Sequence, residues 1–228
     1  MMPTQNDSKS DQIAKDVSSF FDGYAEDFSS IYLEDTKKRS PFNKLMDKLY
    51  RHDIVDRFQR TVKETQKSEI QTILDIGCGP GHFVIKFLEQ GKKVTALDIA
   101  PSMLEITKQR VLSKYPDSDV KYILDDYSAH HFDEQFDAAC VMGFFDYVED
   151  PVSVLKKLLK DIKKEIYISI PGNKGFLAFQ RKIRYKLRNC PLYLYSESDL
   201  KNYLDAAGCL DITEFYKTER GQFIIIRK

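Results

Sequence analysis

Apolar positions divide this chain into short runs of strand length, separated by segments in which apolar residues recur every three or four positions. The short runs lie at residues 70–76, 94–98, 120–124, 136–142 and 165–170. Alternation of strand-like and helix-like patterns predicts consecutive strand–helix units around a parallel sheet. Two further β-rich runs, 210–216 and 222–226, flank a turn. They predict an antiparallel hairpin at the end of an α/β fold.

The residues before the first run show helical spacing. Residues 1–10 are polar, and we expect them to be disordered. A helix is predicted from Ile13, with Phe20, Phe21, Tyr24 and Phe28 on one face. A second amphipathic helix is predicted over 42–58, followed by a charged linker at 63–69. We therefore expect an N-terminal helical cap at 1–65 and a core domain at 66–228.

A glycine-rich turn follows the first apolar run. Gly77, Gly79 and Gly81 alternate, and Asp75 precedes them. A turn between strand and helix aims backbone N–H groups and a positive helix end at a ligand. Dinucleotide sites space their glycines G-x-G-x-x-G, whereas Asp75 repels a diphosphate and suits a cationic amine such as that of S-adenosylmethionine. The alternative is an ordinary tight strand–helix connection.

A second acid, Asp98, ends the next predicted strand, and Pro101 opens the helix after it. A carboxylate in this place accepts both ribose hydroxyls of a bound nucleoside. Dehydrogenases and methyltransferases share this feature, so Asp98 alone does not separate them.

These motifs resemble those of class I S-adenosylmethionine-dependent methyltransferases of the small-molecule type, over residues 70–161. Asp126 after the third run and Phe136–Met142 match the family's third and fourth motifs. The resemblance implies a Rossmann-like, seven-stranded sheet, mostly parallel with the last strand antiparallel. It also implies S-adenosylmethionine as cofactor and S-adenosylhomocysteine as product. The implied cofactor-binding residues are Asp75, Gly77, Cys78, Gly79, Gly81, Asp98, Ile99, Met103, Asp126, Tyr127, Met142 and Tyr24.

Two positions in this resemblance stay open. Asp125 stands before Asp126, where small residues are common, so either acid could meet the adenine. After the fourth run, Asp146 and Tyr147 occupy positions where many relatives carry two histidines. They are the candidate catalytic residues, because the ligand crevice of an open α/β sheet lies beyond the carboxyl ends of its strands. Asp146 could deprotonate a substrate hydroxyl, cap the next helix or hold a loop.

A basic insertion is predicted at about 172–196, and no acid occurs from 166 to 196. We interpret it as a lid over an anionic substrate, because arginine pairs well with phosphate and carboxylate. The candidate substrate-binding residues are Phe145, Arg181, Arg184, Tyr185 and Arg188. A solvated amphipathic helix is the alternative, and contact with an anionic membrane surface would use the same features.

Composition narrows the class of protein. The 228 residues include 35 basic and 35 acidic ones, so the net charge of zero gives no global attraction to nucleic acid. No apolar run reaches the roughly 20 residues of a membrane-spanning helix, and no secretory signal is visible. Four cysteines without C-x-x-C spacing indicate reduced thiols and no metal site. We expect a cytoplasmic protein of open oligomeric state.

The sequence therefore predicts a methyltransferase for a small molecule, anionic if the basic segment binds it, with the acceptor atom (O, N or C) undetermined. Nucleic acid is not the expected substrate, because no N/D-P-P-Y/F motif follows the fourth run. The alternative is a noncatalytic module that binds S-adenosylmethionine or S-adenosylhomocysteine and acts through a partner.

Overall fold

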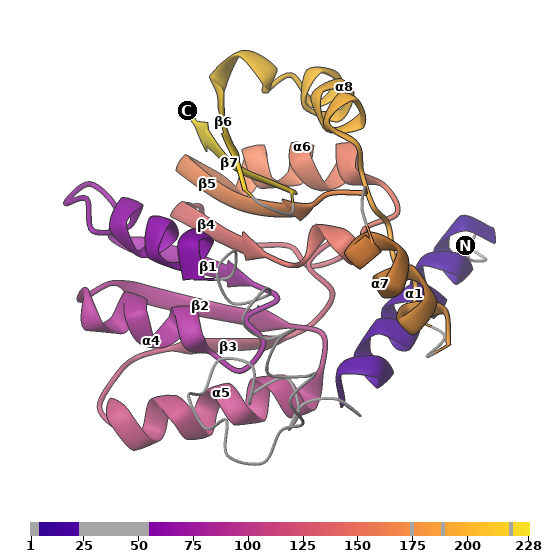
Figure 1. The fold of residues 1–228 in the computed structure, drawn as a ribbon. Helices are drawn as coiled ribbons and strands as arrows, with labels where there is room; N and C mark the ends of the chain where they lie inside the picture. The colour runs from indigo at the N-terminus through magenta and orange to yellow at the C-terminus, as the bar shows by residue number, and fades with distance from the viewer. Residues whose placement is uncertain (1–4, 23–54, 174–175, 188–189, 219–220) are drawn as a thin grey trace.

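The computed structural model describes residues 5–22, 55–173, 176–187, 190–218 and 221–228. Its centre is one seven-stranded sheet in the order β3-β2-β1-β4-β5-β7-β6 (Figure 1). The strands are β1 Thr72–Ile76, β2 Lys93–Asp98, β3 Lys121–Leu124, β4 Phe136–Met142, β5 Ile162–Pro171, β6 Thr213–Lys217 and β7 Gly221–Arg227. Strands β1 to β5 pair in parallel, and β7 runs antiparallel to both β5 and β6. The predicted mostly parallel sheet with an antiparallel end is confirmed.

The labelled helices are α1 Gln5–Asp22, α4 His82–Glu89, α5 Pro101–Lys114, α6 Pro151–Asp161, α7 Phe176–Lys186 and α8 Glu197–Ala207, with short 3₁₀ turns η1 Phe145–Tyr147 and η2 Leu210–Ile212. Helices α6 and α8 cover one face of the sheet, and α4 and α5 cover the other. Successive strand residues alternate between the faces. Leu74 and Ile76 join the core under α6 and α8, while Ile73 joins the core under α4 and α5.

Predicted start and stop signals fall where the helices begin and end. Asp150 caps α6 by accepting the N–H of Ser153 at 3.1 Å. Ser196 and Asp199 form the predicted capping box at the start of α8, and Gly208 ends that helix at φ 77°. Local sequence therefore sets these boundaries.

The N-terminal region departs from the prediction. Composition predicts disorder for residues 1–10, but α1 already begins at Gln5. The other end of α1 packs into a small apolar cluster at Val17, Phe20 and Phe21, and this tertiary packing stabilises the helix. Tyr24, Phe28 and most of the predicted second helix lie outside the described residues.

The helical stretch at 55–64 runs past the predicted end at Phe58 into the expected linker. At its end, the hydroxyls of Thr61 and Thr65 donate to the carbonyls of Arg57 and Thr61 at 2.8 and 3.0 Å.

Two helices far apart in the sequence lie side by side beyond the carboxyl ends of the parallel strands (Figure 1). They are α1 and α7, and they share a small apolar cluster that includes Val17, Phe20 and Tyr185. The Ser18 hydroxyl of α1 also donates to the carbonyl of Ile99 at 3.0 Å. This pair of helices therefore borders the edge of the sheet where the sequence places the site.

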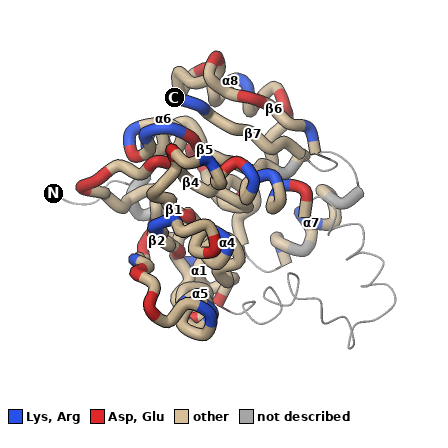
Figure 2. Tube along the Cα trace, turned by 90° about the vertical axis from the view of Figure 1, so that its left-hand side faces the viewer, with Lys and Arg blue, Asp and Glu red and all other residues tan. Residues whose placement is uncertain are grey.

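Acidic and basic residues are interspersed along most of the trace (Figure 2). Among the described residues, no helix has the length and apolar character needed to cross a bilayer.

The packing of α8 against α6 and the sheet generates a test of stability. Leu204 is fully buried in this core. Leu204→Ala should lower the free energy of unfolding by about 2–5 kcal/mol, since it removes buried apolar contacts and leaves a cavity. Leu112→Ala is the control, because Leu112 is 66% exposed on α5, and its effect should stay within about 0.5 kcal/mol. Equal changes in urea denaturation would contradict this assignment of the core.

Candidate functional site

The glycine turn after β1 is closed by its own hydrogen bonds. Gly77, Gly79 and Gly81 have φ of 67°, 52° and 75°, which other residues adopt only under strain. The amides of Gly77 and Cys78 both donate to the carbonyl of Leu97, at 2.8 and 3.1 Å, and the Gly81 amide donates to Cys78. The prediction that the turn's amides point freely at a ligand is therefore wrong for these residues. A turn with engaged amides offers little to a diphosphate.

The turn also packs tightly on α5. A Cβ atom placed on Gly81 would lie 2.7 Å from the side chain of Thr107. The same threonine donates its hydroxyl to the carbonyl of Gly79 at 2.6 Å. Thr107 is a residue that sequence reasoning missed, because its role depends on α5 lying across the turn.

Asp98 joins the turn to the second strand. Its carboxylate accepts the amides of Gly79 at 2.7 Å and Ala100 at 2.9 Å, one on each oxygen. Burial raises the pKa of Asp98 to about 6, although both amide bonds oppose the rise. Each oxygen keeps a lone pair beyond its amide, so the group can also accept from two neighbouring hydroxyls, as a ribose presents them.

Asp75 is a buried carboxyl group near the end of β1. It is 1% exposed, and its Oδ2 has no hydrogen-bond partner among the described residues. Burial and, to a smaller extent, the nearby charge of Asp98 raise the pKa of Asp75 to about 7, although a hydrogen bond with Cys140 opposes the rise. An unpaired buried carboxylate is costly, whereas a cationic amine beside it would satisfy it. The orphaned oxygen therefore fits the ammonium group of S-adenosylmethionine.

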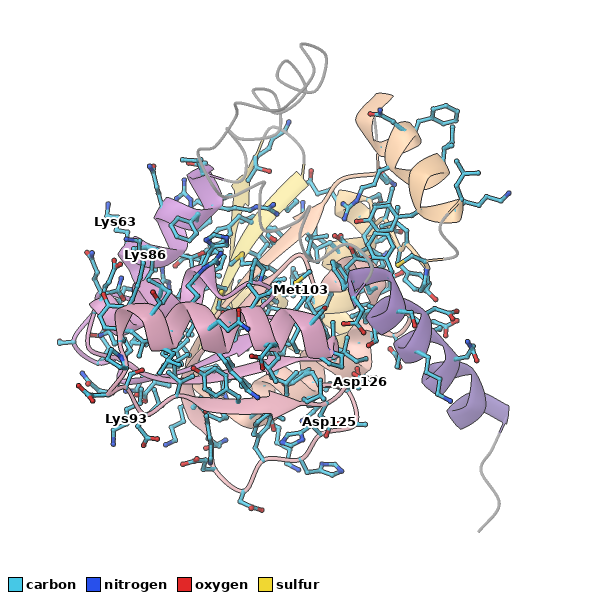
Figure 3. All side chains as sticks on the ribbon, turned by 90° about the horizontal axis from the view of Figure 1, so that it is seen from below. Lys63, Lys86, Lys93, Met103, Asp125 and Asp126 are labelled. Atoms are coloured by element: carbon cyan, nitrogen blue, oxygen red, sulfur yellow. The ribbon has the colours of Figure 1, made fainter. Side chains whose placement is uncertain are left out.

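The two acids after β3 differ in their partners (Figure 3). Asp125 is occupied, since it pairs with the ring of His130 at 2.8 Å and accepts the amide of Asp126. Asp126 is half-buried and accepts the amide of Ser128 at 2.8 Å. Asp126 is thus the better placed of the two for a ligand, at the end of the sheet that α1 borders (Figure 3).

Asp146 lies in η1 directly beyond β4 and is 2% exposed. It forms an ion pair with Arg181 of α7, while its Oδ1 has no hydrogen-bond partner in the described part of the chain. Burial raises the pKa of Asp146, and the charges of Arg181 and Arg57 oppose the rise. The ring of Phe144, two residues earlier, packs 3.6 Å from where a Cβ of Gly77 would stand. Asp146 therefore belongs to the same edge as the glycine turn.

Tyr147 links η1 to α7. Its hydroxyl lies 3.0 Å from that of Tyr185, and the Arg181 guanidinium stacks 5.3 Å from the Tyr185 ring centroid. Burial raises the pKa of Tyr147 well above its usual value, so the phenol stays protonated.

The other predicted residues fall into three groups. Phe145 and Tyr127 are core residues in the structure, and the Tyr127 hydroxyl donates to Asp161 on α6, so neither side chain is offered to a ligand. Cys78, Ile99, Met103 and Met142 are buried or half-buried at the strand-end edge. Tyr24, Arg188 and the side chain of Arg184 lie outside the described parts.

Arg57 is a second residue that sequence reasoning missed. Its guanidinium donates to the Ser169 hydroxyl at 3.1 Å, and that oxygen also accepts the amide of Gly143 at 3.1 Å. The contact joins residues 112 positions apart. No local signal in the sequence could reveal it.

Residues 73–165 match a family model described as a methyltransferase domain. The chain is 31% identical over 105 residues to a ubiquinone biosynthesis O-methyltransferase of Hydrogenovibrio crunogenus, covering 45% of this chain and 42% of that one. It is 28% identical over 129 residues to the putative methyltransferase YqeM of Bacillus subtilis, covering 54% and 51%. The chain thus matches about half the length of these curated relatives.

A solved structure resembles nearly the whole chain. It is the magnesium protoporphyrin IX methyltransferase of Synechocystis PCC 6803 with bound SAH, with a TM-score of 0.69 and 17% identity. The match covers 94% of this chain and 97% of that one. At this identity the likeness shows a shared fold.

The close contact at Gly81 predicts a binding defect. Gly81→Ala should weaken S-adenosylhomocysteine binding at least about tenfold in calorimetric titration, because the added Cβ displaces the turn from Thr107. Gly91→Ala is the matched control, since Gly91 has φ of 71° with no atom within 4 Å of the new Cβ. Equal affinities for the two variants would show that the turn does not shape the ligand site.

The raised pKa of Asp75 predicts a stability profile. A carboxyl with a folded pKa of about 7 contributes stability below pH 4 that is lost as pH rises towards 7. Asp75→Asn should therefore gain stability over the wild type across that range, on the order of a few kcal/mol. Chemical denaturation of the ligand-free protein from pH 4 to 8 measures this difference.

Asp137 provides the opposite case. Burial alone would raise the pKa of Asp137. The ion pair with Lys164 and the amides of Gln71 and Thr72 together lower that pKa by more, so the net shift is downward. Asp137→Asn should lose stability at neutral pH and approach the wild type as pH falls below 4. Parallel profiles for the two variants would refute the assignment of the Asp75 shift.

Sequence family, fold and site geometry agree. The family match covers the turn and both acid-bearing strand ends, the fold is that of methyltransferases of known structure, and the orphaned Asp75 oxygen suits the cofactor's ammonium group. Residues 73–165 therefore match the family of methyltransferase domains, and the chain shares the fold of a solved methyltransferase.

Proposed function

We propose that the chain transfers the methyl group of S-adenosylmethionine to an oxygen atom of a small, anionic molecule. The observation that supports S-adenosylmethionine as the methyl donor is the pair of buried carboxyl groups, Asp75 and Asp98, at adjacent strand ends. Asp75 needs a cation beside its orphaned oxygen, and Asp98 is held by two amides in one orientation. Bound there, the cofactor supplies a methyl group on a positively charged sulfur.

We assign the cofactor contacts accordingly. Asp75 holds the methionine ammonium group, Asp98 the ribose hydroxyls and Asp126 the adenine edge. Asp125 is set aside, because His130 and the Asp126 amide already occupy it.

The proposal that the methyl acceptor is an oxygen atom depends on Asp146. Methyl transfer is an in-line displacement, and positioning of the two reactants can supply about 7–11 kcal/mol. A base is needed when the acceptor carries a proton. The unpartnered Oδ1 of Asp146 can take that proton, while Arg181 holds the other oxygen and orients the group. Tyr147, protonated and paired with Tyr185, serves as a positioning hydroxyl.

Charge and relatives suggest the class of acceptor. Two guanidinium groups, those of Arg57 and Arg181, act on the single carboxylate of Asp146, so positive charges outnumber negative ones immediately around Asp146. Arg181 pairs with Asp146, so we assign to Arg57 the anion-binding role that the sequence predicted for Arg181. The ubiquinone biosynthesis relative reported above is named an O-methyltransferase. So is a malonyl-[acyl-carrier protein] O-methyltransferase of Serratia marcescens, to which this chain is 52% identical over 40 residues. That nucleic acid is not the substrate stays a prediction.

The direct test is methyl transfer from labelled S-adenosylmethionine to a panel of small hydroxy acids, phenols and amines, each with an anionic and a neutral member. The proposal expects turnover of an anionic hydroxyl compound and a raised KM for its neutral counterpart. Turnover of amines alone, or of neutral members equally well, would overturn the choice of acceptor.

Asp146 gives a sharper prediction. Asp146→Asn should lower kcat about 10²–10⁴-fold, because proton transfer to the carboxylate is lost, while S-adenosylhomocysteine affinity is retained. The control is Asp150→Asn, four residues on, which weakens the cap of α6 and should leave kcat unchanged. Thermal melting checks that the Asp146→Asn variant stays folded although Arg181 loses its charged partner. An unchanged kcat in the folded Asp146→Asn variant would exclude Asp146 as the general base.

A further inference from the structure

One helix near the strand-end edge carries large apolar side chains on its outward face. In and just after α7, Phe179, Ile183 and Leu187 are 61%, 46% and 80% exposed. Their spacing of four residues aligns them in one stripe. The amide of Leu187 donates to the carbonyl of Ile183 at 3.0 Å, so the last helical turn includes Leu187. We call these three residues the α7 stripe.

The opposite face of α7 is already in use. Ala178 and Tyr185 are buried, and Arg181 is held by Asp146. The α7 stripe is therefore left over after the helix has made its contacts with the rest of the described chain. Single exposed apolar residues are ordinary, but three aligned on one short helix mark an interaction surface.

The charges beside the stripe have one sign. Lys182 and Lys186 are exposed, and on a helical projection they lie along one edge of the stripe. The chain has 35 acidic and 35 basic residues, yet none of the acids falls between 166 and 196. Along α7 the coloured trace accordingly shows basic segments without acidic ones (Figure 2).

We propose that the α7 stripe, with Lys182 and Lys186, docks the protein on an anionic membrane surface. In a protein interface these lysines would need acidic partners or lose their hydration. At a bilayer their ammonium groups reach the lipid phosphates while the apolar residues enter the boundary of the acyl region. Because α7 has 11 residues, it lies on the surface rather than crossing it.

Docking in this way has a geometric consequence. α7 lies beyond the carboxyl ends of the parallel strands, beside α1 (Figure 1). The edge that holds Asp146 would therefore lie near the membrane surface. This inference goes beyond the proposed function and does not depend on it, since it concerns binding of lipid rather than methyl transfer.

The test is co-sedimentation of the full chain with phosphatidylcholine vesicles that contain or lack phosphatidylglycerol. We expect binding to the anionic vesicles at low salt, little binding to neutral ones, and release at high salt. Leu187→Ser should lower the partition coefficient about tenfold, and Lys182→Glu with Lys186→Glu should remove the preference for anionic lipid. Leu112→Ser on α5 is the matched control and should bind like the wild type.

Three results would overturn the proposal. One is no binding to anionic vesicles at low salt by a protein that still binds S-adenosylhomocysteine and melts cooperatively. Another is an equal loss in Leu187→Ser and Leu112→Ser. The third is a dimer in solution that Leu187→Ser dissociates, which would assign the stripe to a second copy of the chain.

Discussion

The arrangement of the site depends on the bridge that Asp98 makes between two strand–helix connections. One oxygen holds the amide of Gly79 in the turn after β1, and the other holds the amide of Ala100 at the start of α5. Since Gly77 and Cys78 also donate to β2, at Leu97, the turn is fixed to the second strand before any ligand arrives. The site is therefore preorganised, and its polar groups require little reordering when a ligand binds.

This preorganisation requires buried acids with raised pKa values. Asp75 and Asp98 lie close enough for the charge of one to disfavour that of the other, and both are shielded from water. Such an arrangement destabilises the ligand-free protein at neutral pH, as functional sites often do. A cationic ligand offsets this loss, because it provides the counter-charge that the described part of the protein does not place beside Asp75.

A second layer of the site comes from elements outside the strand–helix units. Arg181 reaches Asp146 from α7, Phe21 of α1 packs edge-on against Tyr147 with ring centroids 5.3 Å apart, and Arg57 reaches Ser169. These contacts place aromatic and cationic groups at the strand-end edge. One helix, α7, thus serves two surfaces, with Arg181 turned to the site and the apolar stripe turned outward.

Sequence by itself determined the sheet, the helix boundaries at Asp150 and Ser196, and the glycine turn with its two acids, because these features are encoded in periodicity and in short-range hydrogen bonding. It failed at residues 5–10, where tertiary anchoring of Phe20 and Phe21 overrides a polar composition. Only the tertiary structure decided that the turn's amides are engaged, that Tyr127 belongs to the core and that Arg181 pairs with Asp146. Each of these depends on which groups meet across the fold, and spacing along a chain carries no information on such contacts.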